Sequence, residues 1–143
     1  MDSEHFTVDE VGQGIDEAIA YFEASWDASS PSARDDPTLW NLGAAAVFDG
    51  VAQNGGLVGS IENWFETEPA YVTHAISAFR WLDLTEVAEL VERAAAEYRR
   101  MRPHSCSDEI SAADERLWEQ LDEAYDSHVG TIEQTLTERL AAR

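Results

Sequence analysis

The chain has 143 residues, 44% of them hydrophobic and 10% aromatic, which is enough for the core of one compact domain and excludes a disordered chain. It carries 29 Asp and Glu against nine Arg and no Lys, a formal net charge of −20. That charge excludes direct binding to nucleic acid or to an anionic membrane surface, and it favours basic proteins as partners. No stretch approaches the roughly 20 apolar residues of a membrane span, and the first residues lack the pattern of a signal peptide. We therefore expect a cytoplasmic protein.

Apolar residues recur at spacings of three and four along nearly the whole chain, which predicts amphipathic helices. The first such stretch covers residues 8–26. The second follows Asp36 and Pro37, an N-cap with proline in the first turn, and runs to Asn54-Gly55-Gly56. There, glycine supplies the left-handed conformation that ends a helix.

Further helical stretches follow up to the C-terminus. Asp83 is expected to cap the longest of them and Ser111 the next one, while Pro103 ends the first of these two. Strand signals are scarce. The sequence thus predicts an all-α protein, a compact bundle of six to seven helices that forms a single domain over residues 1–143.

Acidic residues follow two of the predicted helices at helical spacing. Because residues three and four apart are neighbours on a helix surface, each set forms a stripe of like charge that repels itself by a few tenths of a kcal/mol per pair. The first stripe consists of Asp9, Asp16, Glu23 and Asp27, and the second of Glu115, Glu119, Asp122 and Asp126.

Two interpretations of these stripes remain open. DNA carries about one negative charge per 1.7 Å of helix axis, and carboxylates held in rows on rigid helices present a similar field to a protein that binds phosphates. Alternatively, the acids serve solubility alone, as in a salt-adapted cell, and the chain is a helical accessory or immunity-type protein that binds one partner.

A resemblance favours the first interpretation. The segment of residues 47–95 contains Asn54-Gly55-Gly56-Leu57, then Ile61 and Asn63, and residues 121–125 read Leu-Asp-Glu-Ala-Tyr. Both segments resemble the DNA-mimic-protein family of small acidic helical bacterial proteins, whose hallmark is an Asn-Gly-Gly-Phe run followed by Gln, Tyr, Phe and a later Asn. Leu57, Gly59 and Ser60 depart from that hallmark at the Phe, Gln and Tyr positions.

The resemblance implies an all-α fold and, from the family's namesake, binding to a DNA-binding transcription regulator in place of its operator. The expected partner is then a basic DNA-binding protein, either a transcription regulator or a nucleoid protein. The Asn-Gly-Gly motif itself has a structural explanation, since glycines end helices, and we expect Asn54, Gly55, Gly56, Leu57, Ile61 and Asn63 to shape the fold rather than a binding site.

No catalytic motif, cofactor loop or metal-ligand pattern was found, so we expect no enzyme activity, no cofactor and no metal. His104 and Cys106 lie in a loop, but one Cys and one His fall short of a zinc site. Trp118 lies one position off the apolar stripe of its helix. It is therefore expected to contact a partner or a second copy of the chain, in a homodimer.

Overall fold

The computed structural model describes residues 8–24 and 35–143, with side chains from residue 12 onward. In this described part, the stretches with helical spacing of apolar residues form seven helices. No strand occurs in this described part. The helices are α1 (Val8–Ala24), α3 (Pro37–Gly55), α4 (Leu57–Thr67), α5 (Ala70–Trp81), α6 (Thr85–Met101), α7 (Ala112–Asp126) and α8 (Val129–Ala141). The predicted all-α bundle of six to seven helices is confirmed.

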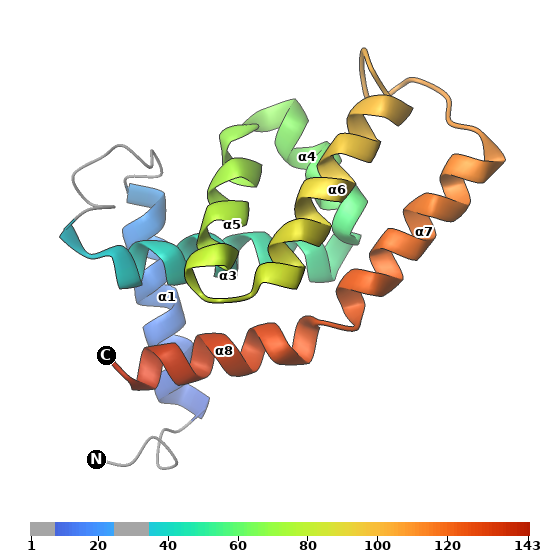
Figure 1. Cartoon of the computed structure of the whole chain (residues 1–143). Coiled ribbons are helices and arrows are strands. Elements are labelled where there is room, and N and C mark those ends of the chain that lie inside the picture. Colours follow the sequence, from blue (N-terminus) through green and yellow to red (C-terminus); the bar gives the residue numbers. More distant parts are fainter. Residues whose placement is uncertain (1–7, 25–34) are drawn as a thin grey trace.

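Helix α3 lies at the centre of the molecule. Helices α1, α4, α5 and α8 pack against it, and α6 packs against α4, α5 and α7 (Figure 1). Helix α7 descends along one side of the bundle, and α8 turns back beneath it toward α1 (Figure 1). Helices α7 and α8 therefore lie along the outside of the bundle that the preceding helices form (Figure 1).

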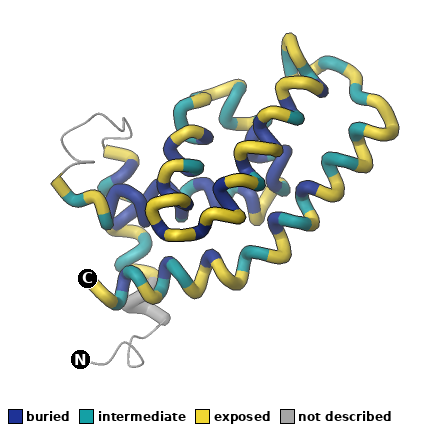
Figure 2. Tube along the Cα trace, viewed as in Figure 1, coloured by how far each residue is buried: buried dark blue, intermediate teal, exposed yellow. Residues whose placement is uncertain are grey.

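The sequence of α3 explains its central place, since this helix is apolar on nearly every side. Ten of its nineteen residues are buried, from Leu39 to Ala52, and Figure 2 shows it as the most continuously buried helix. Its Phe48 ring meets the rings of Phe79 and Tyr125 edge-on, so α3, α5 and α7 share one aromatic cluster. The outer helices alternate buried and exposed residues, as amphipathic surface helices do (Figure 2).

Of the N-caps predicted at Asp36, Asp83 and Ser111, the first and the last are confirmed. The Asp36 carboxylate accepts the backbone N–H of Leu39 at 3.1 Å, and the Ser111 hydroxyl accepts that of Asp114 at 3.1 Å. The predicted Asp83 cap is wrong. The N-cap of α6 is Leu84, without a side-chain hydrogen bond, because Asp83 adopts a φ of 62° in the tight turn after α5.

Among the described residues, none of the helices has the length and apolar character that crossing a bilayer requires.

Candidate interaction surface

The first predicted stripe lies on α1, which carries five carboxylates and no basic residue. Asp16 and Glu23 are exposed on this helix. Asp9 belongs to its first turn, but its side chain is outside the described part, and Asp27 lies wholly outside the described residues. The described α1 surface therefore contributes Asp16 and Glu23, next to the exposed Glu17.

The second predicted stripe lies on α7, which carries six carboxylates and one arginine. Glu115, Glu119 and Asp126 are exposed as expected, and Glu123 is exposed beside them. We call these four residues the α7 row. At 1.5 Å of rise per residue, the row extends about 16 Å along the helix. No ion pair reaches its carboxylates from the described residues.

Asp122, the remaining member of the predicted α7 stripe, differs from its neighbours. It is half-buried, and its carboxylate accepts the backbone N–H of Val58 at 3.0 Å and that of Leu57 at the start of α4. Helix α4 has no cap of its own, because its N-cap residue is Gly56. Asp122 thus caps another helix from 64 positions away in sequence, and we leave it out of the interaction surface.

This contact joins the two segments on which the family resemblance rested. Gly56 has a φ of +81°, and a Cβ atom there would lie 2.7 Å from Oδ2 of Asp122. Only glycine therefore allows both the sharp turn from α3 into α4 and the close approach of the carboxylate. The interpretation of Gly56 as a structural glycine agrees with this geometry.

The other motif residues divide between core and surface. Leu57 and Ile61 are fully buried in the core, whereas Asn54, Gly55 and Asn63 are exposed.

The hydroxyl of Tyr125, three residues after Asp122, donates to Oδ1 of Asp49 on α3 at 2.7 Å, and both residues are buried.

Most of the arginine ion pairs connect one part of the fold with another. Arg80 of α5 pairs with Glu92 of α6, Arg100 of α6 with Asp114 of α7 at 2.7 Å, and Arg102 with Glu62 of α4. Arg139 and Arg143, from the C-terminal end of the chain, pair with Asp83 at 2.9 Å and Asp36 at 2.8 Å. Because these cations lie between elements, they neutralise carboxylates at the junctions and not those of the α7 row.

The guanidinium of Arg100 also holds the pKa of the Asp114 carboxyl below its usual range, through direct hydrogen bonds. Asp114 is therefore charged but neutralised at the start of α7. The first unneutralised carboxylate of the helix is that of Glu115.

The structure does not join the two stripes into one continuous surface. Helix α1 packs on α3 and α8, whereas α7 packs on α4 and α6, and Figure 1 shows α1 and α7 on opposite sides of the molecule. Each helix therefore offers its carboxylates to a different face.

The expectation that Trp118 contacts a partner or a second copy of the chain stays a prediction; within the chain, Trp118 is half-buried. Its ring packs near that of Tyr98, with centroids 6.3 Å apart, and beneath the guanidinium of Arg102 at 5.2 Å. Trp81, at the end of α5, is the large hydrophobic residue that stands out as exposed among the described residues, at 39%. Trp81 lies nine positions after the buried Val72, which is the opposite side of an ideal helix, so helical spacing agrees with its exposure.

The loop between α6 and α7 leaves His104 and Cys106 exposed. Asp108 accepts the backbone N–H groups of His104 and Ser105, which lowers the pKa of its carboxyl and orders the turn. The described residues contain no group of three His, Cys, Asp or Glu side chains that could hold a metal ion.

Fold and surface together define a small, strongly acidic, all-helical protein whose outer helices carry unneutralised carboxylates. Residues 36–143 match the model of the DMP19-like protein family, and the chain belongs to that family. The match includes both segments of the resemblance and everything from the α3 cap to the C-terminus. No significant match was found among curated proteins or among solved structures.

Proposed function

We propose that this protein is a non-enzymatic binding module that imitates DNA and occupies the DNA-binding surface of a transcription regulator or nucleoid protein. The observation that carries the proposal is the α7 row: four exposed carboxylates on one rigid helix, with no ion-pair partner among the described residues. Membership of the DMP19-like family supports it, because the resemblance to DNA-mimic proteins already implied such a partner.

Charge density is the physical basis of the mimicry. The α7 row presents one charge per roughly 5 Å of helix axis, whereas one strand of B-DNA presents one per about 3.4 Å. To a protein that binds phosphates with Lys and Arg, the α7 row therefore presents charges of the same sign and similar spacing to those along one DNA strand. Association with such a protein releases counterions and weakens steeply as the salt concentration rises.

A second candidate function is favoured by one observation. Exposed carboxylates also occur on α6 and α8, at Glu86, Glu89 and Glu138, well beyond the α7 row. Such a spread fits a helical accessory or immunity-type protein whose acids only keep it soluble and whose partner does not bind DNA.

One capture experiment separates the two candidates. The immobilised protein is incubated with lysate of its own cell at low salt, and the bound proteins are then challenged with duplex DNA or with an uncharged polymer. DNA mimicry predicts that duplex DNA releases the captured proteins, because both ligands compete for one basic surface, and that the released proteins bind DNA on their own. Retention of the captured proteins in excess duplex would contradict it.

Two matched variants make the test specific to α7. The row variant carries Glu115→Gln, Glu119→Gln, Glu123→Gln and Asp126→Asn. The control variant carries Glu86→Gln, Glu89→Gln, Glu109→Gln and Glu138→Gln, the same change of charge at exposed positions elsewhere. Mimicry predicts that capture is lost in the row variant and kept in the control. Equal capture by both variants would support the solubility interpretation.

A further inference from the structure

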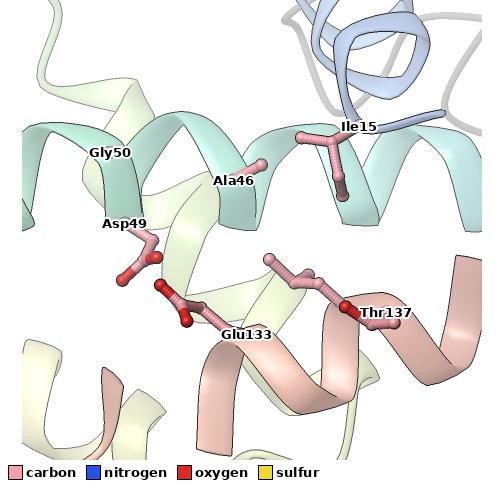
Figure 3. Close-up of a pocket in the computed structure, with 7 residues that line it drawn as sticks. Ile15, Ala46, Asp49, Gly50, Glu133 and Thr137 are labelled. Carbon is pink, nitrogen blue, oxygen red and sulfur yellow. The ribbon is translucent and has the colours of Figure 1, made fainter. Parts of the chain in front are cut away.

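A pocket of about 320 Å³ lies between α1, α3 and α8, away from the α7 row (Figure 3). Its lining is mostly apolar and comes from Ile15, Ala46, Gly50, Leu136 and the stem of Thr137. This volume is at the small end of the roughly 300–1,000 Å³ range of ligand sites, so it suits a short molecule or a single side chain.

Two carboxylates stand together in this pocket. Figure 3 shows the side chains of Asp49 on α3 and Glu133 on α8 pointing toward one another. Asp49 is buried and Glu133 is exposed, so the acidic part of the pocket reaches from the core to the solvent. Among the described residues, no arginine forms an ion pair with either of them.

Each oxygen of the Asp49 carboxylate accepts one hydrogen bond, and the carboxylate can accept more. Its Oδ1 accepts the hydroxyl of Tyr125 and its Oδ2 accepts Nε2 of Gln53, each at 2.7 Å. A carboxylate offers about four acceptor positions, so positions remain for a donor within the pocket. Burial raises the pKa of Asp49, and the charge of Glu133 raises it further. A cation between the two carboxylates would relieve both effects.

Gly50 keeps this pocket wide, although Gly12, Gly55, Gly59 and Gly130 are equally open helical glycines elsewhere. Gly50 lies inside α3, where glycine costs about 1 kcal/mol relative to alanine, yet a Cβ atom there would meet nothing within 4 Å. Its φ is not positive, and no close helix contact requires the absence of a side chain. Gly50 does line the pocket, so a larger residue would narrow it.

We propose that this pocket binds an alkylguanidinium or alkylammonium group, with the cation between Asp49 and Glu133 and the alkyl stem against Ile15 and Leu136. Such a group occurs in small organic cations and in the arginine side chain of a partner protein. The apolar wall accommodates the stem, while the paired carboxylates match the charge and the donors of the head group. This inference does not rest on the proposed DNA mimicry.

The test titrates the full chain with butylguanidinium and follows the amide resonances of residues 46–50 and 133–137 by NMR. Saturable shifts with a dissociation constant on the order of 1 mM are expected. Butanol and butyrate, which keep the stem without the positive charge, are expected to bind at least roughly tenfold more weakly. Equal binding of butanol, or no saturation below about 50 mM butylguanidinium, would overturn the proposal.

Variants assign the binding to this pocket. Glu133→Gln should weaken binding about 3- to 5-fold, as expected for loss of one partly exposed ion pair, while Glu138→Gln on the same helix should leave it unchanged. Gly50→Leu should abolish binding while the far-ultraviolet circular dichroism stays helical. Gly130→Leu, at an exposed and open glycine of α8, should retain it. If Gly50→Leu binds like the unmodified protein, the site is elsewhere and the proposal fails.

A blocked arginine, acetyl-arginine methylamide, separates the two sources. Binding comparable to that of butylguanidinium supports an arginine side chain presented by a protein, because the pocket then admits the attached backbone. Exclusion of the blocked arginine, with butylguanidinium still bound, supports a free small cation.

Discussion

Asp122 shows how one residue can look like part of a charged surface and act within the fold. Its spacing from Glu119 and Asp126 placed it in the acidic stripe, and that spacing is real. Its carboxylate nevertheless binds the N-terminus of α4, because Gly56 lets the two helices approach. Sequence alone could not predict this contact, since the donor Val58 lies 64 positions earlier.

The first prediction concerns this cap. Asp122→Ala should lower the free energy of unfolding by about 1–2 kcal/mol, because the first N–H groups of α4 lose their acceptor. Asp126→Ala, four residues on and exposed, should change it by less than about 0.5 kcal/mol. Urea unfolding followed by circular dichroism measures both. Equal effects of the two substitutions would refute the capping role.

Asp49 gives a prediction about pH. Burial raises its pKa above the ordinary value of 3.8, so the folded state retains this proton at pH values where the unfolded state has released it. Asp49 therefore stabilises the fold most below about pH 3.8, and that contribution is lost as the pH rises through the raised pKa.

Asp49→Asn removes this titration while keeping an oxygen for the Tyr125 hydroxyl. The stability of the variant relative to the unmodified protein should thus increase from pH 4 toward pH 7. Urea midpoints measured across that range test it. A difference that is constant with pH would show that the ionisation of Asp49 carries no cost in the fold.

At the scale of elements, local patterns predicted most of the helices and their buried faces. The apolar residues of α8, Ile132, Leu136 and Leu140, are all buried, and the Asp36 and Ser111 caps are present. Local patterns failed at Asp83, where the turn between α5 and α6 imposes a left-handed conformation and the carboxylate pairs with Arg139 instead. The arginine ion pairs between different parts of the fold could not be predicted from the sequence either, because each joins residues that only packing brings together.

The crossing of α1 over α3 yields the next prediction. A Cβ atom at Gly43 would lie 2.1 Å from the backbone oxygen of Ala18, so these helices touch backbone to backbone. Gly43→Ala should force them apart and destabilise the protein by about 1–3 kcal/mol. Gly59→Ala, at an open position in α4, should instead stabilise it by up to about 1 kcal/mol. Thermal unfolding measures both signs. A stabilising Gly43→Ala would contradict the close crossing.

At the scale of the whole molecule, the net charge of −20 is distributed unevenly among the elements. Arginines neutralise carboxylates where helices meet, the core helix α3 buries its one acid, and α1, α6, α7 and α8 retain unneutralised ones. The sequence predicted which helices carry the stripes. It could not show that these helices lie on opposite sides, because that depends on packing: α1 packs on α3, whereas α7 packs on α4 and α6 (Figure 1).

The most direct test of the mimicry is the salt dependence of binding to a captured partner. For the unmodified protein, the logarithm of the association constant should fall linearly with the logarithm of salt concentration, as it does for DNA. The row variant should bind more weakly with a shallower slope, and the control variant should keep both affinity and slope. Binding that ignores salt, or a row variant with the slope of the unmodified protein, would contradict the account.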